Sequence, residues 1–184
     1  MKIGVYGSSE GEMTQELKEK IRKIGAAIAK LGATLVTGAC PGIPYEAAIG
    51  AKELKGKCIG FSPTVDLEAH QKLGYPTEGF SELFFIPKDY PYAKDPDIGR
   101  KYRNISSVAY IDAAIMIGGR IGSMNEFTIA YDTGKVIGVL EGTGGITKRA
   151  IKVLLEDAAK KTKAEVIFES DPERLVEMIY KKLT

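Results

Sequence analysis

The sequence predicts a doubly wound α/β fold, in which one mainly parallel, Rossmann-like sheet of about seven strands carries helices on both faces. Two observations predict it. Short runs rich in β-branched or aromatic residues recur along the chain, and the segments between them place apolar residues at a period near 3.6. Strict alternation of strands and helices implies parallel strands joined by right-handed crossovers. No linker interrupts this pattern, so we expect one domain over residues 1–184.

The expected strands are the short runs KIGVY (2–6), TLVT (34–37), KCIGF (57–61), ELFFI (82–86), AAIMI (113–117), VIGVL (136–140) and EVIF (165–168). Helical spacing of apolar residues is clearest at Leu17, Ile21, Ile24, Ile28 and Leu31, and again at Ile151, Leu154, Leu155 and Ala158. A further helix is expected within GRKYRNISSVAYID (99–112). The stretches 62–81 and 87–99 are the least regular, and loops of this length are usually functional or mobile.

Composition restricts the classes of function. The chain has 26 Lys and Arg against 24 Asp and Glu, so no strong overall field attracts nucleic acid or a membrane surface. No apolar run approaches the ~20 residues of a membrane span, and no secretory signal opens the sequence, which favours a cytoplasmic protein. Two cysteines, Cys40 and Cys58, exclude a disulfide framework, and one histidine, His70, excludes a His-rich metal cluster. We expect neither a metal nor a cofactor.

Three expected strands end in loops rich in glycine and small hydroxyl residues. Because ligands bind beyond the carboxyl ends of parallel strands, these loops should meet at one ligand-binding edge. Glycine lets backbone N–H groups approach a phosphate, and a following helix start adds partial positive charge. One such loop would be explained by chain turning, but three at one edge predict an anion site. The candidate phosphate- or nucleotide-binding residues are Gly7, Ser8, Gly38, Gly42, Gly118, Gly119, Arg120, Gly122 and Ser123.

Two further groups border the third glycine loop. Ser123 and Glu126 have the spacing of a capping box, in which Ser123 begins a helix and Glu126 reaches back to its amide. The same placement would also bring the Glu126 carboxylate near the sugar of a bound nucleotide. Arg100 and Arg103 lie three residues apart on one helical face, which is either a solvated basic face or a pair that grips phosphate.

A histidine, a cysteine and three tyrosines each have a structural interpretation as well as a functional one. His70 lies in the polar stretch DLEAHQKLG, which indicates a solvated histidine rather than a general base. Cys40 lies in a glycine loop without a partner histidine and is expected to line the pocket as a small residue. Tyr90, Tyr92 and Tyr102 are candidates for stacking on a base, although tyrosines also anchor loops and subunit contacts.

Several of these motifs together resemble one known family. They are Val5-Tyr6-Gly7-Ser8-Ser9, Thr37-Gly38-Ala39-Cys40-Pro41-Gly42, Arg103-Asn104, Asp112 and Gly119-x-x-Gly122-Ser123-x-x-Glu126. The combination is similar to the LOG (Lonely Guy) family, long labelled as lysine decarboxylases. That family includes nucleoside 5′-monophosphate phosphoribohydrolases and related molybdenum-cofactor carrier proteins. The resemblance covers most of the chain and is strongest from about residue 100 to 140.

The resemblance implies a nucleotide-binding protein and leaves two functions open. Carried over from the hydrolase motif, Arg103 and Glu126 would be catalytic, and the products would be free base and ribose 5-phosphate. Four positions depart from the hydrolase motif. Gly118 replaces a proline, Arg120 a glycine and Ser123 a threonine, and Asn104 replaces the lysine that commonly follows the arginine. The pair Arg103-Asn104 and the Gly118-Gly119 start of the loop are closer to the sequences of the carrier-like branch. The alternative is therefore a non-catalytic carrier or sensor of a phosphorylated ligand such as molybdenum cofactor.

The sequence does not support lysine decarboxylation. Pyridoxal chemistry needs a lysine that forms a Schiff base, and no motif in the sequence identifies such a lysine. LOG-like proteins are dimers or larger, and the resemblance implies the same here. Apolar side chains on more than one face of the expected helices also favour a homodimer or larger assembly. Those side chains are Tyr102, Ile105, Tyr110, Phe127, Ile129 and Tyr131.

Overall fold

The computed structural model describes residues 1–184 and contains one seven-stranded sheet in which all strands are parallel. The strand order is β4-β3-β2-β1-β5-β6-β7, which confirms the predicted doubly wound α/β class. The strands are β1 (Lys2–Gly7), β2 (Thr34–Thr37), β3 (Cys58–Phe61), β4 (Glu82–Phe84), β5 (Ala113–Ile117), β6 (Val136–Leu140) and β7 (Glu165–Glu169).

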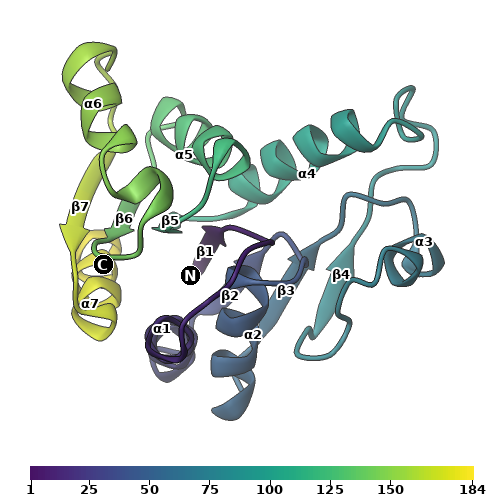
Figure 1. Ribbon diagram of the computed structural model, residues 1–184, viewed down its shortest axis with the longest axis horizontal. Helices are drawn as coiled ribbons and strands as arrows, with labels where there is room; N and C mark the ends of the chain where they lie inside the picture. The colour runs from purple at the N-terminus through teal and green to yellow at the C-terminus, as the bar shows by residue number, and fades with distance from the viewer.

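Helices cover both faces of the sheet (Figure 1). They are α1 (Gln15–Lys30), α2 (Ile43–Glu53), α3 (Leu67–Lys72), α4 (Pro96–Tyr110), α5 (Ile121–Asp132), α6 (Ala150–Asp157) and α7 (Pro172–Leu183), with a 3₁₀ turn η1 (Gly145–Thr147). Several begin where the sequence supplies an acceptor for the free N–H groups of the first turn. Thr14 caps α1, Asp95 caps α4 and Asp171 caps α7, and proline follows each aspartate.

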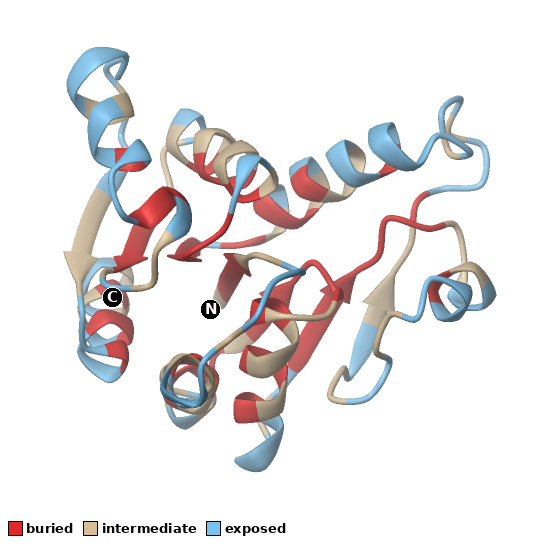
Figure 2. Ribbon diagram, in the orientation of Figure 1, coloured by how far each residue is buried: buried red, intermediate tan, exposed pale blue.

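The core consists of two apolar clusters, one on each side of the sheet. The first joins α1, α2 and α7 to the inward residues of β1, β2 and β5. The second joins α4, α5 and α6 to the opposite face of the same strands and includes Phe127 and Met116. The central strands are therefore buried on both faces, as Figure 2 shows, whereas β7 and α6 at one edge are more exposed. Burial on both faces explains why the strand sequences are almost continuously apolar.

The order in which strands are added to the sheet reverses between β1 and β5, and this switch point positions the site. From β1 the chain builds the sheet outward through β2, β3 and β4, and it then crosses to β5 on the other side of β1. Gly7 at the end of β1 pairs with Ile117 at the end of β5. The loops that follow these two strands consequently diverge to opposite faces and leave a crevice between them.

Three local predictions were wrong. The irregular stretch 62–81 contains the short helix α3, and β4 ends at Phe84 rather than at residue 86. Helix α5 begins at Ile121 with Arg120 as its N-cap, so Ser123 lies inside the first turn and no capping box forms with Glu126. No helix combines the length and the apolar composition needed to cross a bilayer.

Candidate functional site

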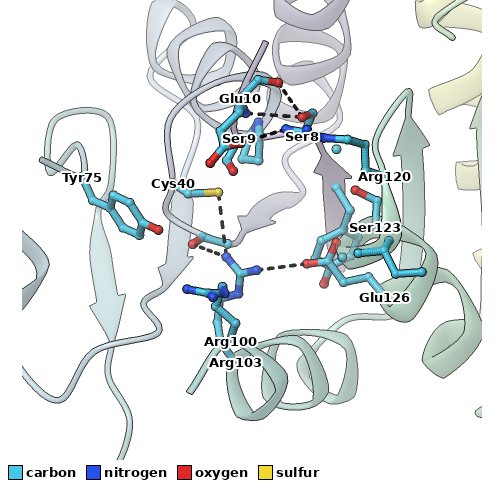
Figure 3. Close-up of a pocket in the computed structure, with 16 residues that line it drawn as sticks. Ser8, Ser9, Glu10, Cys40, Tyr75, Arg100, Arg103, Arg120, Ser123 and Glu126 are labelled. Atoms are coloured by element: carbon cyan, nitrogen blue, oxygen red, sulfur yellow. Dashed lines mark hydrogen bonds and ion pairs between the residues drawn. The ribbon is translucent and has the colours of Figure 1, made fainter. Parts of the chain in front are cut away.

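A cavity of about 340 Å³ opens at the crevice between β1 and β5, and we call it the main cavity. The loops after β1, β2 and β5 and the helices α4 and α5 contribute its walls (Figure 3). Of the residues proposed from the sequence, those that line it are Gly7, Ser8, Gly38, Arg100, Arg103, Arg120, Gly122, Ser123 and Glu126. Gly42, Gly118 and Gly119 line an adjoining hollow, which Ser8, Glu10 and Arg120 also border.

The loop after β5 has the form of an anion cradle. Gly118 and Gly119 have φ angles of 51° and 85°, which favour glycine, and a Cβ on Gly119 would lie 2.4 Å from Ser123 Oγ. The first helical hydrogen bond of α5 runs from Met124 N to Arg120 O. The N–H groups before Met124 therefore have no helical acceptor, and no side chain caps them. Such a helix start attracts phosphate or carboxylate.

Arg103 lies on the floor of the main cavity, where neutral atoms hold its guanidinium. Nε and Nη2 donate to Asn104 Oδ1 at 3.1 and 2.8 Å, and Nη1 donates to the Gly38 carbonyl at 3.0 Å. Nη1 also lies 3.8 Å from Cys40 Sγ. Because most of its donors are engaged, Arg103 cannot grip a phosphate with two parallel hydrogen bonds without leaving these partners.

Glu126 faces Arg103 across the floor. One carboxylate oxygen lies 3.7 Å from Arg103 Nη2, and only 5% of the Glu126 side chain is exposed. Burial raises the pKa of Glu126 to about 7, and the positive charge of Arg103 opposes this rise. At neutral pH the carboxyl group is therefore divided between its protonated and ionised forms, which suits a group that exchanges protons.

A pair of asparagines joins the two helices behind these residues. Asn104 Nδ2 donates to Asn125 Oδ1 at 2.9 Å, and Asn104 is almost fully buried. Asn104 thus connects Arg103 on α4 with the residue that precedes Glu126 on α5. Together, Arg103, Asn104, Asn125 and Glu126 form what we call the floor network.

The rim of the main cavity is more open. Arg120 Nη2 lies 2.9 Å from Glu10 Oε2, and both side chains are largely exposed. Arg100 also borders the cavity and forms an ion pair with Asp97. Ile121 contributes an apolar side chain that is 81% exposed. These side chains are held less tightly than the floor network.

Sequence reasoning missed Glu10, Ile121 and Tyr75 as lining residues, and it named Tyr6 and Ser9 only as parts of the motif at the end of the first strand. Tyr75 follows α3, which no periodicity revealed. Tyr90 packs against both Tyr92 and Tyr102, and none of the three lines the main cavity.

Cys40 lines the main cavity, and burial raises the pKa of its thiol, so that the thiolate nucleophile is disfavoured. No three His, Cys, Asp or Glu side chains lie close enough to hold a metal ion.

The prediction of a solvated His70 was wrong. The ring is fully buried, with Nδ1 2.9 Å from Ser62 Oγ and Nε2 3.1 Å from the Pro76 carbonyl. The polar stretch around it is the outer face of α3, and His70 is the residue that turns inward. A single polar helix of six residues has too few positions for an apolar face to be recognised from sequence.

The model of the SLOG cluster4 family matches residues 1–176. The chain belongs to this family. Membership confirms the LOG-like resemblance of the motifs around Arg103 and Gly119. An uncharacterized protein of Archaeoglobus fulgidus is 30% identical over 142 residues, which cover 77% of this chain and 80% of that protein.

Solved structures similar to this SLOG cluster4 protein share its fold. The protein TM1055, a structural genomics target, superposes with a TM-score of 0.79 at 24% identity and 98% coverage of each chain. The molybdenum cofactor binding protein of Rippkaea orientalis gives 0.74 at 22% identity, covering 100% of this chain and 97% of that one. DNA processing protein A of Helicobacter pylori, which binds single-stranded DNA, gives 0.65 at 20% identity, covering 100% and 82%.

Proposed function

We propose that this protein binds a phosphorylated nucleotide in the main cavity and hydrolyses its N-glycosidic bond. The phosphate would contact the N–H groups of the loop from Gly119 to Ser123 at the start of α5, because the Gly118 N–H already donates to Thr143 Oγ1. The sugar would then lie over the floor network, with Glu126 and Arg103 as the catalytic residues. No lysine lines the cavity, which also argues against Schiff-base decarboxylation.

The observation that carries this proposal is the position of Glu126 beside an anion cradle. A carboxyl group buried near a phosphate site opposes anion binding whenever it is ionised. A protein that only holds a phosphate gains nothing from such a group. A hydrolase benefits from such a group, because a carboxyl group with a pKa near 7 can both give up and accept a proton at neutral pH.

The proposed reaction breaks the bond between C1′ of ribose and the base nitrogen. As that bond lengthens, the sugar gains oxocarbenium character, which the ionised Glu126 stabilises. Water attacks C1′ and gives a proton to Glu126. The base leaves with the electron pair of the broken bond and takes up the proton that Glu126 then releases, carried through water, so that the carboxylate is regenerated. Arg103 keeps Glu126 in place and offsets its charge, and the products are free base and ribose 5-phosphate.

The test is incubation with a panel of nucleoside 5′-monophosphates, followed by chromatography for free base and a colorimetric assay for ribose 5-phosphate. We expect both products in equal amounts from at least one nucleotide. Tight binding of these nucleotides without product would overturn hydrolysis.

The second candidate is a carrier or sensor of a phosphorylated ligand such as molybdenum cofactor. Two features favour it: the similarity in fold to the molybdenum cofactor binding protein, and the presence of Asn104 and Arg120 where hydrolases have lysine and glycine. Under this proposal the glycine loop still holds a phosphate, and the ligand is released unchanged. Binding without turnover in the same panel distinguishes it from the hydrolase.

We also propose that single-stranded DNA is not the ligand. DNA-binding grooves combine a cationic track with aromatic platforms. Here the formal net charge is only +2, and Glu10 and Glu126 lie in the cavity itself. Fluorescence anisotropy with a labelled oligonucleotide checks this, and we expect no binding at 150 mM salt below micromolar protein.

Finally, we propose a cytoplasmic homodimer or larger assembly. Phe127 on α5 is buried against its own sheet and is not available for a subunit contact. Ile98 and Ile105 on α4 and Ile121 on α5 remain exposed and would form that contact. Light scattering over a concentration series should give a mass of at least twice 19.9 kDa.

A further inference from the structure

A second cavity of about 260 Å³ adjoins the main one, and Tyr75 and Arg100 line both. It lies between α3, the segment 63–65 and the start of α4. In Figure 1, α3 and the loop leading into α4 lie on the same side of the molecule. Figure 3 shows Tyr75 across the main cavity from Ser123 and Glu126, so the second cavity opens on the side away from the anion cradle.

The two cavities differ in chemistry. Glycines, serines and charged side chains dominate the main cavity. Aliphatic side chains dominate the second one, namely Pro63, Val65, Ala69, Leu73, Ala93 and Pro96. Leu73 is 57% exposed, so its side chain adds apolar surface at the open edge of this cavity. A ligand that spans both cavities would therefore have an anionic end and an apolar end.

The wall of the second cavity is braced from behind. His70, directly after Ala69 on α3, bonds to Ser62 Oγ and to the Pro76 carbonyl. Ser62 Oγ lies 2.7 Å from Thr64 Oγ1, which donates to the Asp66 carbonyl. This buried polar network fixes α3 against the segment before it, so the cavity is present without rearrangement.

The border of the second cavity offers hydrogen-bond donors. Lys94 is in no ion pair, and Arg100 contacts only Asp97. Both are cations and can donate but not accept. The edge of the apolar group that faces them should therefore carry carbonyl or ring-nitrogen acceptors.

We propose that the second cavity binds the flat heteroaromatic ring of the ligand whose phosphate lies at the Gly119–Ser123 loop. The ring is a flat heterocycle with carbonyl or ring-nitrogen acceptors at its edge, which the purine base of a nucleotide supplies. Tyr75 lies where the ring passes from one cavity to the other. This inference rests on the proposed binding of a phosphorylated ligand, but it holds for either hydrolase or carrier.

The experiment compares guanosine 5′-monophosphate with ribose 5-phosphate, which lacks the ring. Calorimetry is done in the Glu126→Gln background so that hydrolysis adds no heat. We expect the nucleotide to bind at least about tenfold more tightly than the sugar phosphate. Ala69→Phe, which fills the second cavity, should remove most of that advantage and leave the affinity for ribose 5-phosphate unchanged.

A second pair of variants guards against misfolding. Leu73→Ser removes an exposed apolar wall residue, and Leu54→Ser is its matched control, because Leu54 is also an exposed leucine at the end of a helix. Only Leu73→Ser should weaken nucleotide binding. An unchanged nucleotide affinity in both Ala69→Phe and Leu73→Ser would overturn the subsite. So would loss of the advantage in Ile121→Ser alone, which would place the ring at the opposite rim. Absence of binding by both ligands would overturn the proposed function together with this inference.

Discussion

Arg103 and Arg120 carry the same charge at one cavity but in opposite environments. Arg103 is buried, and Asn104, Gly38 and the neighbouring Glu126 fix it in one orientation. Arg120 is exposed and shares a single ion pair with Glu10, which belongs to another loop. Exposed ion pairs contribute little free energy, whereas removal of one partner from a buried pair is costly. The floor is thus organised before a ligand binds, and the rim can adjust to it.

The largest expected effect comes from changing Glu126, the proposed catalytic carboxyl group of the floor. Glu126→Gln should lower turnover by about 10²–10⁴-fold and leave ligand affinity equal or slightly higher, because the lost charge acts mainly in the transition state and opposes an anionic ligand in the ground state. Steady-state kinetics and calorimetry on the same variant measure the two quantities. Arg120→Gly is the rim control and should keep most of the turnover. Equal activity of Glu126→Gln and the parent protein would remove Glu126 from the mechanism.

Removal of the Asn104 side chain should destabilise the floor network without changing the Glu126 carboxyl group. In Asn104→Leu, two guanidinium nitrogens of Arg103 and Asn125 Oδ1 lose their partner in a buried site. We expect a loss of about 2–4 kcal/mol in the free energy of unfolding, measured with urea. Asn104→Asp keeps an acceptor for Arg103 and should lose less at neutral pH. If both variants are as stable as the parent, the network does not brace the floor.

The buried carboxyl group of Glu126 should also make the free energy of unfolding depend on pH. The pKa of Glu126 is about 7 in the folded protein and near 4.5 in the unfolded chain, so the folded state binds this proton more tightly. The resulting stabilisation is complete below about pH 4.5 and is lost as pH rises through about 7. It amounts to at most about 3 kcal/mol, since one unit of pKa corresponds to about 1.4 kcal/mol.

Thermal melting of Glu126→Gln beside the parent protein isolates this contribution, because all other titrating groups are common to both. The parent should lose stability relative to the variant between about pH 4.5 and pH 7, with little further loss at higher pH. Parallel curves for the two proteins would show that Glu126 is not perturbed.

The rim should give the smallest effects. Arg120→Gly should weaken binding of an anionic ligand by about 1 kcal/mol, because the side chain is exposed and salt screens it. Glu10→Gln frees Arg120 from its partner and should strengthen binding by a similar amount. Calorimetry with ribose 5-phosphate at low and high salt measures both. A loss in Arg120→Gly as large as that in a floor variant would contradict the contrast between floor and rim.

The sequence by itself determined the fold class, because apolar strands and amphipathic helices alternate and their period is local information. It also located the glycine loops, since strand ends in a parallel sheet share one edge. It was wrong where the decisive partner is distant in sequence. Ser123 and Glu126 have the spacing of a capping box, yet Glu126 turns to Arg103, which another helix supplies.

Only the tertiary structure decided which of Arg100 and Arg103 lies on the floor of the main cavity. Arg100 and Arg103 share a helical face, but burial and the Gly38 carbonyl, 65 residues away, hold Arg103 alone on the floor. It likewise decided that His70 braces α3 and that Tyr75 borders both cavities. The reason is physical: periodicity reports which side of an element faces a core, whereas hydrogen-bond partners and pKa values depend on packing between segments far apart in the chain.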